Sequence, residues 1–248
     1  MGDVMTINYD PTLVVISVLI AIAGTLTGLA VITGYDQSGR RNYASSLIRA
    51  AIVIGGSIWS MHFVAMLAVR VPVFISYNFI ETIFSLYIAI TGTLFGLFVV
   101  SRRRLGALSI PVGSICMGAA IGGMHYLGMD AIRGCIVSYV PSGVLAAIGI
   151  AIVASALALW FTFRKRGVAE TLLGGFFLGA AIPSMHYTAM YATTFGYLEV
   201  KISNGEPLMS QDMLAFIISG TTFVICGVFL LLFSFMAISG SEKAANRS

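Results

Sequence analysis

The three histidines of this chain lie in three copies of one short pattern. The copies occupy residues 55–68, 118–131 and 179–192, and each reads Gly-x-x-Ile-x-x-Met-His-(Phe/Tyr)-x-x-Met-x-Ala. His62, His125 and His186 hold the same place in their copies, 63 and then 61 residues apart. Because the chain has no other histidine, this recurrence predicts one shared polar centre.

Each copy also brings two methionines to its histidine. On a helix, residues four apart share a face and adjacent residues point about 100° apart, so one methionine stacks on the histidine and the other flanks it. Imidazole is the commonest metal ligand, and soft thioether sulfur favours copper, above all Cu(I). The predicted metal ligands are His62, His125, His186, Met61, Met66, Met124, Met129, Met185 and Met190. Tyr126, Tyr187 and Asp130 are expected to contact these ligands and hold them in place without binding the metal themselves.

Other interpretations of these residues stay open. A single histidine in an apolar helix is usually a packing residue, and methionines usually fill gaps. Two of the histidines could instead hold haem as axial ligands, which leaves the methionines unexplained. A copper transport or handling role needs further soft ligands deeper in the membrane, and the candidates are Cys116, Met117 and Cys226. We expect no enzyme, since no carboxylate pair, nucleophile–base set or phosphate-binding loop is evident.

The composition is that of an integral membrane protein. Apolar residues make up 58% of the chain and charged residues only 10%, which argues against a soluble domain. Seven apolar stretches are long enough to cross a bilayer as helices: 11–33, 46–69, 79–100, 107–129, 143–163, 171–192 and 213–238. We therefore expect an all-α, polytopic membrane protein with seven transmembrane helices.

The placement of Lys and Arg predicts the orientation. Eleven of the 14 fall on one side of the predicted membrane, and only Arg70, Arg133 and Lys201 fall on the other. By the positive-inside rule the N-terminus lies outside and the C-terminus in the cytoplasm. This distribution also accounts for the net charge of +4, so we expect no nucleic-acid partner.

The motifs are expected in one layer of the outer leaflet. His62 lies eight residues before Arg70, and His125 lies eight before Arg133, which is about 12 Å at the rise of an α-helix. The two arginines are expected to reach lipid headgroups or to pair with Asp130 or Glu81.

The chain is also predicted to contain an internal repeat of two helices. Each motif-bearing span follows a span with small residues four apart, as at Gly24 and Gly28 or Gly92 and Gly96, which lets helices approach closely. Three two-helix repeats with the same topology should be related by an axis along the membrane normal. The seventh span is then a closing helix, and residues 193–212 form either a small hairpin over the outer face or a plain connector.

Met185-His186-Tyr187-Thr188 resembles the signature of the MHYT domain, a bacterial membrane sensor module, and residues 124–127 and 61–64 look like variant copies. The resemblance implies a sensor domain over residues 1–238 in the bacterial inner membrane. It implies copper near the outer face and a diatomic gas (oxygen, carbon monoxide or nitric oxide) as the signal. It also implies a cytoplasmic output domain or partner signalling protein, for which the tail at 239–248 is the attachment point. Whether the protein oligomerises stays open.

Overall fold

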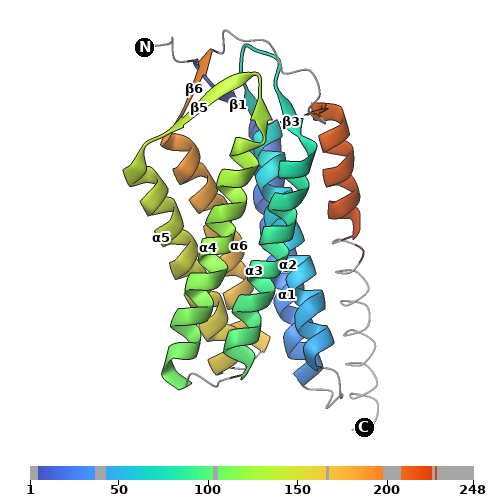
Figure 1. Ribbon diagram of the computed structural model, residues 1–248. Coiled ribbons are helices and arrows are strands. Elements are labelled where there is room, and N and C mark those ends of the chain that lie inside the picture. The colour runs from blue at the N-terminus through green and yellow to red at the C-terminus, as the bar shows by residue number, and fades with distance from the viewer. Residues whose placement is uncertain are drawn as a thin grey trace.

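The computed structural model describes residues 5–36, 43–102, 106–165, 168–197, 208–224 and 227. Its frame consists of long helices (Figure 1): α1 (Pro11–Asp36), α2 (Tyr43–Leu67), α3 (Phe79–Arg102), α4 (Ser109–Asp130), α5 (Pro141–Trp160) and α6 (Val168–Tyr191). A 3-10 turn, η1 (Gly106–Leu108), leads into α4, and a π-helical turn, η2 (Phe161–Lys165), follows α5. Residues 211–224 are helical as well. Most of the rest of the seventh predicted span lies outside the described residues.

The helices have the length and composition of membrane spans. Five within the described ranges are long and apolar enough to cross a bilayer: Pro11–Ile32, Ala44–Leu67, Phe79–Arg102, Gly106–Asp130 and Pro141–Phe163. Helix α6 has 24 residues but is not among the five. Leu19, Phe95 and Leu145 lie exposed on the outside of the bundle, as lipid-facing side chains do.

The six helices form a closed ring of three two-helix units. Each helix packs against the next along the chain, and α1 packs against α6. Helix α2 also contacts both α4 and α6, so the three motif-bearing helices meet in the interior. The units are therefore α1 with α2, α3 with α4 and α5 with α6. This arrangement bears out the predicted threefold repeat of helix pairs.

The first glycine of each motif sets the contact between one unit and the next. A Cβ at Gly118 would lie 2.6 Å from the Cα of Ile152, so only a glycine lets α4 approach the backbone of α5 this closely. Gly55 meets the backbone of Ile90 on α3 in the same way, and Gly179 meets that of Ile22 on α1. The three contacted isoleucines are equivalent in the repeat, so the units follow one another around the ring with one geometry.

A cap of short strands covers one end of the bundle (Figure 1). Its members are β1 (Asn8–Tyr9), β2 (Val69–Arg70), β3 (Ser76–Asn78), β4 (Ile132–Arg133), β5 (Cys135–Tyr139), β6 (Thr193–Tyr197) and β7 (Leu208–Met209). They pair antiparallel as β1-β2, β4-β3-β7 and β5-β6. We call these seven strands the strand cap. Of the hairpin considered for residues 193–212, residues 198–207 lie outside the described residues. The two strands seen in this range do not pair with each other: β6 pairs with β5, and β7 pairs with β3.

Ion pairs tie the strand cap to the helix starts. Arg133 on β4 donates to Glu81 in the first turn of α3 at 2.9 Å, one of the pairings expected from the sequence. Arg70 on β2 donates to Asp10 at 2.6 Å, and this hydrogen bond holds the pKa of the Asp10 carboxyl below its usual value. Asp10 also caps α1 by accepting from the backbone N–H of Thr12. Both arginines are thus held by ion pairs at the end of the bundle that the strand cap covers.

Candidate metal centre

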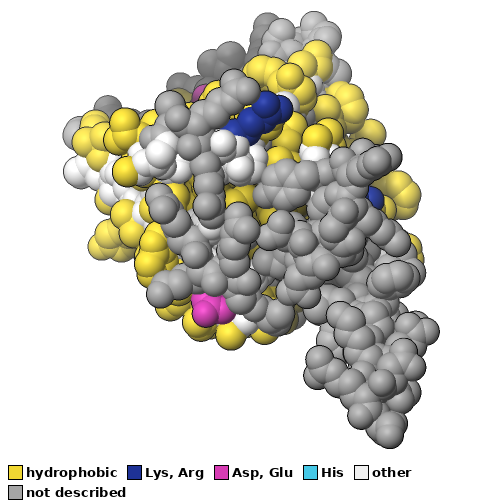
Figure 2. Space-filling view, turned by 90° about the horizontal axis from the view of Figure 1, so that it is seen from below, with side chains coloured by type: hydrophobic (Ala, Val, Ile, Leu, Met, Phe, Trp, Pro, Cys, Tyr) yellow, Lys and Arg dark blue, Asp and Glu magenta, His cyan; other side chains and the backbone are white. Residues whose placement is uncertain are grey.

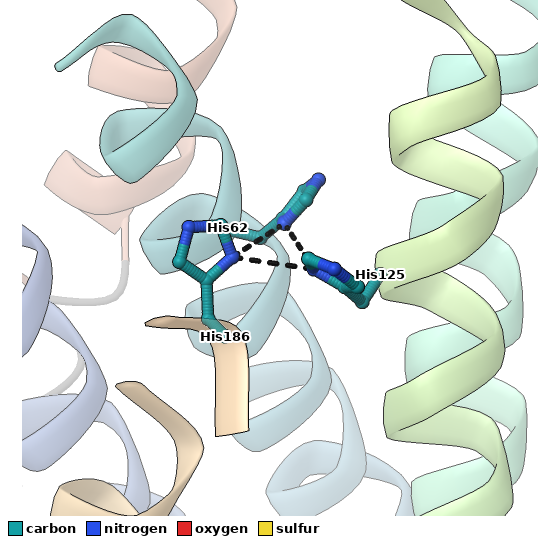
Figure 3. A group of neighbouring side chains, drawn as sticks. All are labelled: His62, His125 and His186. Carbon is teal, nitrogen blue, oxygen red and sulfur yellow. Dashed lines mark hydrogen bonds between the residues drawn. The ribbon is translucent and has the colours of Figure 1, made fainter. Parts of the chain in front are cut away.

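The three histidines meet at the centre of the ring. The Nδ1 atoms of His62 and His186 lie 3.1 Å apart, those of His62 and His125 3.2 Å, and those of His125 and His186 3.2 Å. The rings stand steeply to one another, with interplanar angles of 76° to 85°, and all three are fully buried. Figure 3 shows the three Nδ1 atoms pointing to a common point from three different helices. We call this group the histidine triad.

The repeat places the triad at one depth. Helices α2, α4 and α6 end at Leu67, Asp130 and Tyr191, each five residues after its histidine. At 1.5 Å per residue this is about 7.5 Å from the helix ends. The expected common layer is therefore present, just beneath the strand cap.

Hydrogen bonds alone cannot satisfy a triangle of this kind. Each Nδ1 is either a donor or an acceptor, according to the tautomer of its ring. With three members in a closed cycle, at least one pair must be two donors or two acceptors. All three lone pairs can point inward without conflict only if a positive charge lies between them. The geometry therefore favours a cation over a hydrogen-bonded histidine cluster.

The size of the triangle also suits a metal ion. The centre of a triangle with these sides lies about 1.8 Å from each nitrogen, close to the roughly 2.0–2.1 Å of metal–imidazole bonds. Among the His, Cys, Asp and Glu side chains of the described residues, these three histidines form the group that could hold a metal ion. The donor set is all nitrogen at its core, with no carboxylate in that group.

Layers of buried side chains lie on either side of the triad. One turn towards the strand cap, the predicted ligands Met66, Met129 and Met190 are fully buried, as are Met61, Met124 and Met185 beside the histidines. One turn in the other direction lie the motif isoleucines, Ile58, Ile121 and Ile182, and a turn beyond them Ile54, Met117 and Leu178. The turn of each inner helix on the cap side of its histidine thus carries a buried methionine, and the two turns on the other side carry mainly aliphatic side chains.

Of the expected supporting residues, Tyr126 and Tyr187 contact the triad and Asp130 does not. The Tyr126 ring packs against His125 with centroids 4.8 Å apart, and Tyr187 packs against His186 at 5.0 Å. Asp130 is exposed and accepts a hydrogen bond from Tyr139 at 3.2 Å. The expectation for Asp130 is therefore corrected: at the last residue of α4 its carboxylate turns to the surface.

A second aromatic layer, not predicted from the sequence, connects the motifs with the strand cap. Phe63 packs against Tyr77 with centroids 6.0 Å apart, Tyr126 against Tyr139 at 5.2 Å, and Tyr187 against Tyr9 at 6.2 Å. Tyr9, Tyr77 and Tyr139 are equivalent in the repeat, because each lies two residues before the start of α1, α3 or α5. Their common position before the first helix of each unit is the sequence feature from which this layer could have been predicted.

Desolvation raises the pKa of the cap tyrosines. It is the main cause that raises the pKa of Tyr9, Tyr77 and Tyr139 above the usual value, and the nearby Asp130 raises that of Tyr139 further. The shifts move their ionisation still farther above the physiological pH range, in which phenols are already uncharged. The three tyrosines serve as packing between the cap and the aromatic residues of the motifs.

Comparison with known proteins places the chain. Residues 2–45, 55–113 and 118–175 match the repeat described as MHYT, a bacterial signalling protein N-terminal repeat. The chain belongs to the MHYT family. Two of the MHYT matches begin at or close to the motif glycines Gly55 and Gly118, and His186 lies beyond the matched residues. The third MHYT copy is therefore identified by its motif and by its place in the triad.

Several MHYT relatives are signalling proteins. The chain is 35% identical over 196 residues to the bifunctional diguanylate cyclase/cyclic di-GMP phosphodiesterase MucR of Pseudomonas aeruginosa, covering 76% of this chain and 28% of that protein. It is 32% identical to the signaling protein YkoW of Bacillus subtilis, covering 76% and 24%. The cyclic di-GMP phosphodiesterase NbdA of P. aeruginosa is 33% identical, covering 82% and 26%. The chain thus spans about a quarter of these relatives' length, and no solved structure matches it.

Proposed function

We propose that this signalling protein senses through a single copper ion bound by the histidine triad. The observation that carries the proposal is the triangle of three buried Nδ1 atoms 3.1–3.2 Å apart. Such a triangle holds one cation between its members, and the atoms are too close for each histidine to build a separate site. One ion per chain is therefore the expected stoichiometry.

Copper is the metal that the surrounding residues favour. Six buried methionines lie in or next to the layer of the triad, and thioether sulfur selects Cu(I). When bound, copper would supply a redox-active centre able to take a diatomic ligand. The residues of this chain would hold it, exclude water from it and transmit changes in its coordination to three helices at once.

Haem fits this arrangement less well. Two axial histidines hold an iron from opposite sides of a flat macrocycle, whereas these three rings meet at one point from three directions. The triad is fully buried, which leaves little room for a macrocycle between the rings.

The layers around the triad favour sensing over transport. A permeation route needs ligands continuing towards the other end of the bundle, but two layers of mainly aliphatic side chains follow the triad there. Met117 is the one soft ligand in them, and Cys116 is half-buried beside it, while the third candidate, Cys226, lies outside the described residues. Figure 2 views the bundle from that end, and none of the side chains it colours there is a histidine. Metal is therefore expected to enter and leave through the strand cap.

The signal would pass to the cytoplasm through the helices. We infer an orientation with the strand cap outside, because Arg70 and Arg133 lie in the cap and eleven of the 14 Lys and Arg residues of the sequence fall on the other side of the predicted membrane. The relatives carry the cyclic di-GMP activities that their names state. An output domain of that kind, or a partner protein that carries one, would read a change in the helices, provided that the bundle has two arrangements which the ligand distinguishes. Oxygen, carbon monoxide or nitric oxide, or the copper oxidation state itself, is the proposed input.

Metal analysis of the purified protein tests the proposal. The wild type is expected to hold about one copper per chain after loading and desalting, and a variant with all three histidines changed to alanine is expected to hold almost none. Equal copper in the two proteins would exclude the triad as the site. Three ions per wild-type chain would exclude a shared centre. A Soret band in the absorption spectrum would indicate that the protein binds haem and not copper.

A further inference from the structure

The edge of His62 that points away from the centre lies against a glycine. A Cβ added to Gly128 on α4 would lie 2.5 Å from Nε2 of His62, 3.0 Å from its Cδ2 and 3.2 Å from Cζ of Phe63. The first separation is shorter than non-bonded contacts allow, and the other two are tight. The ring therefore occupies the space that any side chain at position 128 would need.

The other two histidines lack such a glycine. Gly128 lies three residues after His125, and the equivalent residues after His62 and His186 are Ala65 and Ala189, both buried. By the order of the units around the ring, the positions equivalent to Gly128 are Ala189 for His125 and Ala65 for His186. Because a methyl group cannot lie 2.5 Å from a ring nitrogen, the His125 and His186 rings must lie farther from these positions than the His62 ring lies from Gly128.

We propose that Gly128 is a positioning residue that allows His62 to act as the third metal ligand; this inference rests on the proposed function. A methyl group at position 128 would displace Nε2, and the rigid imidazole would then swing its Nδ1 out of the triangle. His125 and His186 would keep their places. The site would change from three nitrogen ligands to two.

The affinity for Cu(I), measured by competition with a chromophoric chelator, tests the inference. Gly128→Ala is expected to lower the affinity by about 10–100-fold, the range seen when the support of a metal ligand is lost, and to match His62→Ala. The double variant His62→Ala/Gly128→Ala is expected to bind like His62→Ala alone, because the two changes remove the same ligand. Ala65→Gly and Ala189→Gly are the matched controls and are expected to stay within about threefold of wild type.

The double variant also covers a failure of Gly128→Ala to fold. If the conflict is between the methyl group and the His62 ring, His62→Ala removes it and restores folding. A double variant as unstable as Gly128→Ala alone would overturn the proposal, as would wild-type affinity in a folded Gly128→Ala. So would an equal loss of affinity in Ala65→Gly and Ala189→Gly, which would indicate general loosening. A wild type without copper would instead remove the proposed function itself, so the two failures are distinguishable.

Discussion

The rings of Tyr126 and Tyr139 meet edge to face with their centroids 5.2 Å apart, and this contact connects the strand cap with the triad. Tyr126 in turn packs against His125. The equivalent pairs in the other units are Phe63 with Tyr77 and Tyr187 with Tyr9. Since a phenylalanine serves in one of the three, the ring and not the hydroxyl makes the contact.

The first prediction separates ring from hydroxyl. Tyr126→Phe is expected to change the free energy of unfolding by less than about 0.5 kcal/mol, because the Tyr126 hydroxyl has no hydrogen-bond partner among the described residues. Tyr187→Phe is expected to cost about 1 kcal/mol, because the Tyr187 hydroxyl lies 3.1 Å from Oγ of Ser17. Unfolding in detergent with increasing denaturant measures both. A larger cost for Tyr126→Phe would contradict this assignment.

The second prediction concerns helix contact between units. Gly118→Ala would press a methyl group against the backbone of Ile152 on α5 and is expected to destabilise the protein by about 1–3 kcal/mol, as overpacking does. Gly149 on α5 is the control, since a Cβ there meets nothing within 4 Å. Gly149→Ala is expected to be neutral or to stabilise by about 0.5–1 kcal/mol through helix propensity. Equal thermal shifts in both variants would mean that the units do not pack this closely.

The third prediction tests the methionines as ligands. Met66→Leu, Met129→Leu and Met190→Leu together are expected to lower the affinity for Ag(I), a redox-inert soft ion like Cu(I), because leucine replaces the volume but not the sulfur. Met117→Leu is the matched control on the other side of the triad and is expected to leave the affinity unchanged. If the triple variant binds Ag(I) as the control does, the three nitrogens hold the ion without help from these thioethers.

The fourth prediction is a pH dependence at Cys135. Burial in the strand cap raises the pKa of this thiol from 9.0 to about 11, so about 100-fold less thiolate is present near pH 8 than in the unfolded chain. Alkylation of Cys135 by iodoacetamide, measured by mass spectrometry with Cys116 and Cys226 changed to alanine, is expected to be slower by at least that factor in the folded protein, because the thiol is also buried. The rate should rise tenfold per pH unit up to about pH 11. A rate that levels off near pH 9 would show an unshifted thiol.

The sequence predicts the helix pairs, their threefold repeat and the convergence of the histidines, and the structure confirms these. The reason is that helical periodicity shows which stretches form helices, and a repeated motif places equivalent residues at equivalent positions in each helix pair. In all three copies, five residues separate the histidine from the end of its helix. Residues 211–224 are helical and lie in the range of the expected seventh span, but they are not among the five candidate spans, so seven membrane crossings stay a prediction.

The strand cap and its contacts were not predictable in the same way. Strands of two to five residues, such as β1 and β5, carry too little alternation to recognise. Asp130 was expected to support the metal ligands, but at the last residue of α4 it is exposed. The role of Gly128 depends on which ring of a neighbouring helix it meets, and that follows only from the order of the units around the ring.

The odd number of histidines has a consequence for the interaction energy between their ring nitrogens. Four such rings could alternate donors and acceptors and rest without a metal, whereas three always leave one pair in repulsion. If the triad binds copper as proposed, the bound cation would remove this repulsion. A change of helix spacing on binding would then be shared among the six helices of the closed ring.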